Sequence, residues 1–248
     1  MLLAIDIGNT NIGFGVFKGP KLIRSFNIAT HNYNCKKLKS LLGKNIFKDA
    51  IICSVVPRTT LTLSRDLTKI LGKKPYIIGK DIKVPVKNCY SRPKEVGADR
   101  LIGAYAGIQL YGAPLIIIDF GTAITFDLVS KDKAYLGGMI LPGLQLSLDA
   151  LAQKTALLPK LKLDLPKDFI GRDTKNSMLS GIVYGFASLT DNLIKKIRLK
   201  LGKNVKVIVT GGNTQLMAKY SSQIKIKNPD LILKGLRLVY QKEILCVK

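Results

Sequence analysis

Apolar runs rich in β-branched residues alternate with helix-like stretches along the first part of the chain. Runs of this kind, bounded by Gly, Asn or Pro, are typical of strands. The pattern predicts, in order, strands over Leu2–Ile7, Ile12–Phe17 and Leu22–Ile28, a helix around Lys36–Leu42, a buried strand over Ala50–Val55, a helix near Thr60–Leu71 and a strand over Pro75–Gly79. The first three strands follow one another as a meander, so the predicted order is β-β-β-α-β-α-β.

The second part of the chain repeats this opening. The segment PLIIIDFGTAITFDLV, Pro114–Val129, places a strand, an Asp-x-Gly-Thr turn and a strand in the same order as AIDIGNTNIGFGVF, Ala4–Phe17. The pattern then predicts a third strand near Ala134–Met139, a long helix from about Leu144, helices around Ser177–Leu201, a buried strand over Val205–Asn213 and a closing helix near Gly235–Leu245. Two such turns indicate duplicated domains whose turns can face each other across a cleft. We therefore predict two α/β lobes, residues 1–112 and 113–248.

The composition is that of a globular protein. A length of 248 residues and a hydrophobic content of 47% are sufficient for a substantial core. No window of about 18 apolar residues is present, and Asp6 interrupts the first apolar run, so the sequence predicts neither a membrane span nor a secretion signal. We therefore expect a cytoplasmic protein without a membrane partner.

The cysteine and histidine content argues against a zinc site or a disulfide framework. His31 is the only histidine, and no CxxC pair joins the four cysteines, which are Cys35, Cys53, Cys89 and Cys246. We interpret all four cysteines as reduced thiols.

A formal net charge of +24 is the most prominent compositional feature. Such a charge is compatible with a nucleic-acid partner, but the basic residues are spread along the whole chain. On the helix-like segment Leu189–Lys203, apolar residues recur every four positions while the lysines lie off that stripe, as on a solvated amphipathic helix. We therefore favour lysine-rich solvated faces over a polyanion-binding groove, and we expect no specific nucleic-acid partner. The positive electrostatic field of these basic residues would attract an anionic substrate.

The turn after the first predicted strand has the composition of a phosphate-binding loop. Gly8 and Gly13 allow backbone conformations closed to other residues, and the short polar residues between them offer donors beside the main-chain N–H groups. The turn is not a Walker loop, because Phe14 stands where the lysine would be and a strand follows.

A carboxylate precedes each of the two repeated turns. Asp6 ends a buried strand, where it could hold a hydrated Mg²⁺ beside phosphates; a carboxylate that caps a hairpin is the alternative. Because Asp119, Gly121 and Thr122 repeat the arrangement, we favour phosphate handling.

A late strand ends in a third glycine-rich segment. Gly211 and Gly212 follow the predicted strand in VIVTGGN, where the backbone could approach an adenine or ribose face closely, although such a pair is usually only a turn. Together with the two Asp-x-Gly turns, this segment resembles the pattern of the acetate and sugar kinase, chaperone and actin superfamily. The superfamily alone does not name the substrate.

The middle segment YSRPKEVGADRLIGAYAG, Tyr90–Gly107, supplies a carboxylate and a guanidinium side by side at an expected helix start. Asp99 could accept the proton of an attacking hydroxyl, and Arg100 could hold an anionic substrate or the developing phosphoryl charge. The alternative is a first-turn aspartate favoured by the helix dipole, with the arginine in a surface ion pair.

Six motifs, in order, resemble the type III pantothenate kinases over nearly the whole chain: DIGNTNIGFGVF, EVGADRLIGAYAG, IIIDFGTAITFD, GGMILPG, GRDTKNSMLSG and VTGGN. The resemblance implies two duplicated ribonuclease H-like (actin-like ATPase) domains with a nucleotide cleft between them. It implies transfer of the γ-phosphoryl group of ATP to the terminal hydroxyl of pantothenate, the first step toward coenzyme A, with Mg²⁺ and a monovalent cation, K⁺ or NH₄⁺. It also implies a homodimer in which the region of Thr174 reaches the partner's acceptor site.

The resemblance also assigns roles by position. Asp99 is implied to be the proton acceptor and Asp119 the ligand of the monovalent cation, while the Mg²⁺ role of Asp6 rests on its place at the end of the first strand. The residues implied to bind ATP are Asp6, Ile7, Gly8, Asn9, Thr10, Asn11, Ile12, Gly13 and Thr122, to which the superfamily pattern adds Gly211 and Gly212. The residues implied to line the pantothenate site are Tyr90, Gly97, Ala98, Asp99, Arg100 and Thr174.

Two positions depart from the family pattern, which usually has Asn where this chain has Arg92 and Asp173. The negative charge of Asp173 would oppose an anionic substrate unless the side chain faces away or the neighbouring Arg172 and Lys175 offset it. Relatives of the family are also known as accessory factors for transcription, so the alternative function is a nucleotide-binding regulator without kinase activity.

Overall fold

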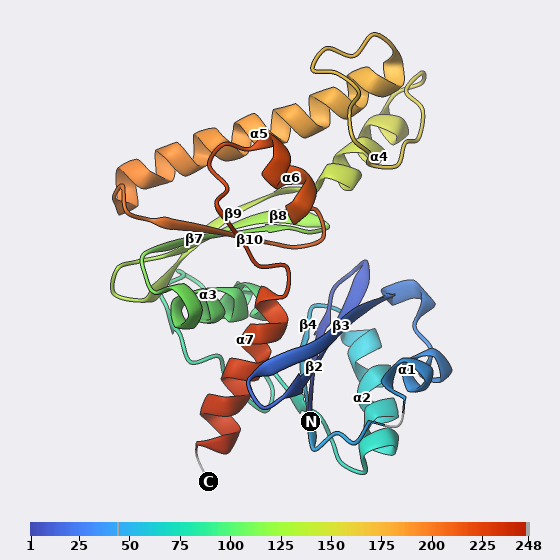
Figure 1. Cartoon of the computed structure of the whole chain (residues 1–248), viewed down its shortest axis with the longest axis vertical. Coiled ribbons are helices and arrows are strands. Elements are labelled where there is room, and N and C mark those ends of the chain that lie inside the picture. The colour runs from blue at the N-terminus through green and yellow to red at the C-terminus, as the bar shows by residue number, and fades with distance from the viewer. Residues whose placement is uncertain (44, 247–248) are drawn as a thin grey trace. The chain divides into compact units, whose positions relative to one another are not determined.

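The computed structural model describes residues 1–43 and 45–246 of the chain. These residues form two compact units (Figure 1). The first unit comprises Met1–Leu110 together with the chain from Asp230 onward, and the second comprises Tyr111–Pro229. None of the helices within the described ranges combines the length and the apolar character needed to cross a lipid bilayer.

The first unit is built on a mixed sheet with strand order β3-β2-β1-β4-β5. Strands β1 (Leu2–Ile7), β2 (Asn11–Lys18) and β3 (Lys21–Ala29) form an antiparallel meander. Strand β4 (Asp49–Ser54) runs parallel to β1, and β5 (Tyr76–Ile77) runs parallel to β4. The meander and the order of elements that the sequence predicts are thus present.

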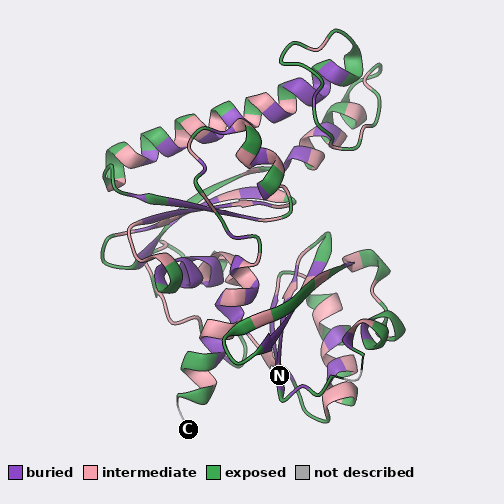
Figure 2. Ribbon diagram, in the orientation of Figure 1, coloured by how far each residue is buried: buried purple, intermediate pink, exposed green. Residues whose placement is uncertain are grey.

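Helices on both faces of this sheet explain why β1 and β4 are almost continuously apolar (Figure 2). On one face, Leu3, Ile5 and Ile7 of β1 share a buried cluster with residues of α1 (Cys35–Leu42) and α2 (Pro57–Leu71). On the other face, Leu2 and Ala4 share a second cluster with residues of α3 (Ala98–Tyr111) and α7 (Leu231–Tyr240). Short elements in the same part of the chain are η1 (Thr30–Asn32), β6 (Lys87–Asn88), η2 (Pro93–Glu95) and the π-helical segment η3 (Gln241–Leu245); β6 is not a strand of the first unit's sheet.

The second unit repeats the same strand plan. Strands β7 (Leu115–Phe120), β8 (Ala123–Val129) and β9 (Ala134–Pro142) form an antiparallel meander, and β10 (Lys206–Thr210) runs parallel to β7, as β4 does to β1. Strand β11 (Ile226–Lys227) continues the sheet beside β10. Helices α5 (Thr174–Leu201) and α6 (Thr214–Tyr220) cover one face of this sheet (Figure 1), and α4 (Leu144–Lys154) packs against α5.

The division of the chain differs from the predicted lobes at the C-terminal end. The predicted second lobe spans residues 113–248, whereas the structure groups α7 with the first unit. Leu233, Leu236 and Val239 of this helix lie in the same buried cluster as Leu2 and Ala4 of β1. The apolar face of α7 therefore completes the core of the first unit, a contact that sequence proximity does not reveal.

Candidate functional site

The turn between β1 and β2, here called the phosphate turn (Asp6–Gly13), is a short closed loop. Asp6 pairs with Gly13 across the two strands. Within the loop, the Gly8 N–H donates to the carbonyl oxygen of Asn11 at 3.0 Å. The side chains of Asn9, Thr10 and Asn11 are exposed, so the short polar groups that the sequence singled out face solvent.

Gly8 and Gly13 do not use the left-handed backbone conformations that glycine allows, because neither has a positive φ. At both positions an added side chain would instead approach a neighbouring oxygen closely. A Cβ at Gly8 would lie 3.2 Å from the carbonyl oxygen of Asn11, and a Cβ at Gly13 would lie 3.4 Å from Oδ1 of Asn27. These glycines therefore provide space within a tight turn rather than an unusual torsion.

The carboxylates of Asp6 and Asp99 lie in one region of the first unit. Cys53 on β4 is the strand partner of Asp6 and is fully buried. Burial raises the pKa of the Cys53 thiol, and the negative charges of Asp6 and Asp99 raise it further. Cys53 also shares a buried cluster with Ala98, so β4, the strand beside β1, lies near the start of α3.

Asp99 occupies the first turn of α3, as the sequence predicts. Its Oδ1 accepts the backbone N–H of Arg100 at 2.9 Å. A Cβ on Gly97 would lie 2.4 Å from the same oxygen, so the carboxylate occupies the space that a side chain at position 97 would take. The backbone hydrogen bond and the missing side chain together set the orientation of the carboxylate. Ala98 and Arg100 flank it and are partly buried, as is Tyr90, whose backbone N–H donates to Oδ1 of Asn88 at 3.0 Å.

The second Asp-x-Gly turn, Asp119–Thr122, follows β7 in the second unit. Gly211 has a φ of +89° and follows β10 directly. A Cβ there would lie 2.2 Å from Oδ1 of Asp119 and 2.7 Å from the carbonyl carbon of Phe120. Position 211 therefore requires glycine because its backbone packs directly against the Asp119 turn. Gly212 faces open space, because no heavy atom lies within 4 Å of its Cβ position.

Gly143 is a residue of this turn that sequence reasoning did not assign. Its N–H donates to the carbonyl oxygen of Thr122 at 3.0 Å, and a Cβ there would lie 2.3 Å from that oxygen. The sequence feature that could have identified Gly143 is the GGMILPG motif, which ends at this residue. Gly143 thus joins Asp119, Thr122 and Gly211 in one compact arrangement.

The two departures from the family pattern have local structural partners. Asp173 is the N-cap of α5: its Oδ1 accepts the Asn176 N–H at 2.8 Å, and its Oδ2 accepts the Asn176 side-chain amide at 2.6 Å. These bonds, with smaller contributions from Lys167 and Lys175, lower the pKa of Asp173. Asparagine caps helices equally well, so the substitution preserves the cap. Arg92 pairs with Glu95 at 3.1 Å on the surface.

The residues that the structure describes hold no cluster of three or more His, Cys, Asp or Glu side chains suited to a metal ion. Mg²⁺ at a nucleotide site does not need such a cluster, since one or two carboxylates together with phosphate oxygens and water are sufficient. A single carboxylate at the end of β1, beside an exposed polar turn, fits that donor set.

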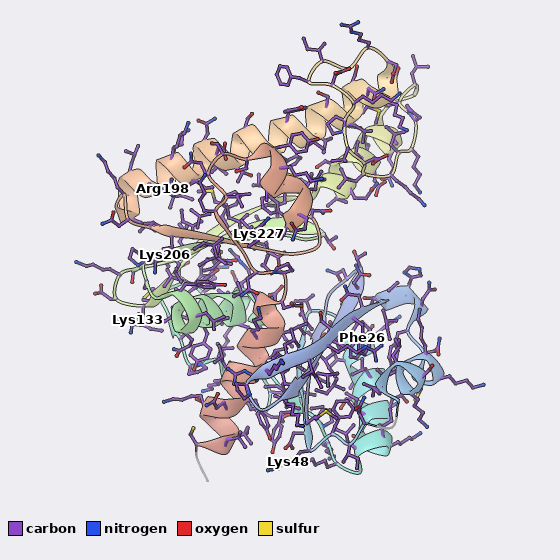
Figure 3. The ribbon with its side chains drawn as sticks, in the orientation of Figure 1. Phe26, Lys48, Lys133, Arg198, Lys206 and Lys227 are labelled. Carbon is purple, nitrogen blue, oxygen red and sulfur yellow. The ribbon has the colours of Figure 1, made fainter. Side chains whose placement is uncertain are left out.

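Four basic side chains of the second unit come from four different parts of the chain. Figure 3 shows Lys133, Arg198, Lys206 and Lys227, which come from the β8–β9 loop, α5, β10 and β11. Three of them bind neighbouring oxygens: Arg198 donates to Gln223, Lys206 to the carbonyl of Tyr111 at 2.6 Å, and Lys227 to Gln215 at 3.5 Å.

Comparison with known proteins gives concordant matches. A family model described as Type III pantothenate kinase matches residues 2–196. The chain is 42% identical over 252 residues to a type III pantothenate kinase of Finegoldia magna, with 96% of each chain covered. It is 38% identical over 254 residues to one of Agathobacter rectalis, with 98% of each chain covered.

Among solved structures, a protein of Campylobacter jejuni described as a Baf family transcriptional activator has a TM-score of 0.60 at 22% identity, covering 97% of this chain and 98% of that one. The activator of the 2-hydroxyisocaproyl-CoA dehydratase from Clostridium difficile, with bound ADPNP, has a TM-score of 0.56 at 14% identity, covering 98% and 94%. These likenesses concern the fold, which is the mixed α/β, actin-like ATPase fold that the sequence predicts.

Proposed function

Because this chain belongs to the type III pantothenate kinase family, we propose that it transfers the γ-phosphoryl group of ATP to the terminal hydroxyl of pantothenate. The product is 4′-phosphopantothenate, and the reaction is the first step of coenzyme A biosynthesis. The observation that carries the proposal is the family match across almost the whole chain. The polar turn after β1 and the carboxylate in the first turn of α3, both in the first unit, support the proposal.

Asp99 is the proposed proton acceptor. In phosphoryl transfer the protein mainly positions the groups and stabilises charge, and a carboxylate takes the proton of the attacking hydroxyl. The hydrogen bond from the Arg100 N–H and the space left by Gly97 hold this carboxylate in one orientation. The guanidinium of Arg100, adjacent in the same turn, is the proposed partner of the pantothenate carboxylate. Tyr90, Gly97 and Ala98 complete the proposed substrate site, and we propose that Thr174 contributes to the acceptor site of the partner in a homodimer.

The phosphate turn and the Asp119 turn are the proposed binding groups for ATP. Backbone N–H groups and short polar side chains of Asp6–Gly13 are suited to phosphate oxygens, and we assign Thr122, Gly211 and Gly212 to the same nucleotide. When bound, Mg²⁺ would neutralise charge on the phosphates, with Asp6 as its protein ligand. We assign the monovalent cation, K⁺ or NH₄⁺, to Asp119.

We also propose that the protein acts as a homodimer. Large apolar side chains stand exposed on α4 and on the segment that joins it to α5. We call this set the apolar surface; its members are Leu146, Leu151, Leu157, Leu165, Phe169 and Ile170. Exposed large apolar side chains that gather on one face are typical of a protein–protein interface, and the segment that carries most of them ends just before Thr174.

The proposed function is tested by ADP release from purified protein with Mg²⁺ and ATP. The assay is run with and without pantothenate, and with K⁺ or NH₄⁺ in place of Na⁺. We expect release that requires pantothenate and rises with K⁺ or NH₄⁺, with 4′-phosphopantothenate detected by mass spectrometry. Asp99→Asn should lower kcat by at least about a hundredfold, since general-base catalysis contributes about 10²–10⁴-fold, while ATP binding is retained.

Two results would contradict this proposal. Folded wild-type protein that releases no ADP with pantothenate under any cation would favour the nucleotide-binding regulator. Asp99→Asn with near-normal turnover would remove Asp99 from the role of proton acceptor.

A further inference from the structure

Thr30, the first residue of η1 after β3, contacts the phosphate turn at two points. Its hydroxyl donates to the carbonyl oxygen of Gly8 at 2.7 Å. Its backbone N–H donates to the carbonyl oxygen of Thr10 at 2.9 Å. A single partly buried residue, distant in sequence, therefore binds the turn on both sides of Asn9.

These two bonds determine where the N–H groups of the turn point. In a planar trans peptide, the carbonyl and the following N–H point in opposite directions. The Gly8 carbonyl shares its peptide with the N–H of Asn9, and the Thr10 carbonyl shares its peptide with the N–H of Asn11. Because both carbonyls are directed at Thr30, both N–H groups are directed to the opposite side of the turn.

We propose that Thr30 is a positioning residue for the nucleotide, which aims the N–H groups of Asn9 and Asn11 at phosphate oxygens by holding the carbonyls behind them. The inference rests on the proposed function of the turn as the phosphate site. Thr30 acts through the turn, which it contacts by both hydrogen bonds. The two hydrogen bonds keep a short glycine-containing loop in one orientation before ATP binds, so that less ordering is required on binding.

The two hydrogen bonds require different chemical groups of residue 30. The backbone bond continues the pairing of β2 with β3, which any residue except proline could provide. The hydroxyl bond to Gly8 requires Thr or Ser. The hydroxyl is therefore the atom to remove, and valine removes it while keeping the branched shape.

Three variants isolate this hydrogen bond. Thr30→Val deletes the hydroxyl, and Thr30→Ser retains it. Thr68→Val is the matched control, because the Thr68 hydroxyl makes a similar bond, to the carbonyl oxygen of Ser64 at 2.8 Å, inside α2. Each variant is compared with the wild type in calorimetric binding of Mg²⁺ with the non-hydrolysable analogue AMP-PNP, in KM for ATP and for pantothenate, and in melting temperature.

We expect Thr30→Val to weaken AMP-PNP binding and to raise KM for ATP by about three- to tenfold, the effect of losing one hydrogen bond. KM for pantothenate should stay within about twofold of wild type. Thr30→Ser should restore the wild-type values, and Thr68→Val should leave nucleotide binding unchanged. A merely structural role would lower the melting temperature of both valine variants without separating the two KM values.

Unchanged AMP-PNP binding by folded Thr30→Val, or equal weakening in Thr30→Ser, would overturn the inference. The binding measurement needs no pantothenate, so it gives an answer even if the wild type proves not to phosphorylate pantothenate. If the wild type does not phosphorylate pantothenate but Thr30→Val still weakens AMP-PNP binding, only the proposed acceptor is rejected, and the inference about Thr30 stands.

Discussion

At the residue scale, glycines in both units make room for carboxylate oxygens. Oδ1 of Asp99 lies 2.4 Å from the Cβ position of Gly97, and Oδ1 of Asp119 lies 2.2 Å from that of Gly211, too close for a side chain in either case. Gly97 precedes α3 and Gly211 follows β10, and each aspartate is one of the proposed site residues. The glycines therefore act through the aspartates, by letting each carboxylate adopt its orientation.

This arrangement predicts the effect of Gly97→Ala. The backbone at Gly97 does not require positive φ, so alanine is permitted by torsion, but its methyl would stand 2.4 Å from Oδ1 of Asp99. The carboxylate must move, and we expect kcat to fall by roughly ten- to a hundredfold while KM for ATP changes little. Gly185→Ala is the control, because no heavy atom lies within 4 Å of its Cβ position on α5. Turnover by Gly97→Ala within about twofold of wild type would contradict this account.

At the element scale, the start of α5 is held by a local cap. Asp173 accepts two hydrogen bonds from Asn176 and ends the loop that carries the apolar surface. Its negative charge also lies at the positive end of a 28-residue helix. The departure from the family's usual asparagine therefore changes the charge and preserves the cap.

Because asparagine can cap a helix and alanine cannot, the two corresponding substitutions of Asp173 should differ in their effect on the melting temperature. Asp173→Ala should lower the melting temperature by roughly 2–4 °C, whereas Asp173→Asn should change it little. Because the pKa of Asp173 is lowered in the folded protein, the charge-dependent part of its contribution is present above the ordinary carboxyl pKa of about 3.9 and is lost as pH falls through the lowered value. Thermal unfolding of the three proteins between neutral and acidic pH tests this. A constant difference between wild type and Asp173→Asn down to strong acid would contradict the charge-dependent part.

At the scale of the whole molecule, the N- and C-terminal parts of the chain share one unit. Tyr240, at the end of α7, donates to Oδ2 of the buried Asp49 at 2.5 Å, and Lys73 binds the other oxygen of Asp49 at 2.6 Å. These contacts tie the end of α7 to the start of β4. The second unit, in contrast, carries the exposed apolar surface.

The apolar surface predicts the oligomeric state. Ile170 is 72% exposed, and Ile170→Glu places a charge where a partner would have to bury it. We expect the wild type to be dimeric and Ile170→Glu to shift toward monomer by at least about tenfold in dissociation constant. Leu199→Glu, at an equally exposed site on the far end of α5, should remain dimeric. Light scattering after gel filtration measures all three proteins; a monomeric wild type, or a dimeric Ile170→Glu, would refute the assignment.

Much of the fold could be predicted from the sequence, because the spacing of apolar residues in long segments distinguishes strands from helices. The predicted strand Leu2–Ile7 has the bounds of β1, and the repeat of strand, turn and strand at Asp119 is present. The predicted helices around Ser177–Leu201 form one continuous helix, α5, whereas the long helix expected from Leu144 ends at Lys154. Elements β6, α6 and β11 were missed because two to seven residues are too few to show a period. The family was also predictable, because its motifs are local and specific, and the family match confirms it.

The sequence by itself determined the order of strands and turns, the duplicated Asp-x-Gly turns and the family, because each is recorded in neighbouring residues. Only the tertiary structure decided that α7 joins the first unit, that Gly97 and Gly211 make room for carboxylates, and that Thr30 binds the phosphate turn. These features depend on contacts between residues far apart in the chain or on the orientation of single side chains. The physical reason is that hydrophobic period and turn composition specify local structure, whereas close packing and hydrogen-bond direction arise only when distant segments meet.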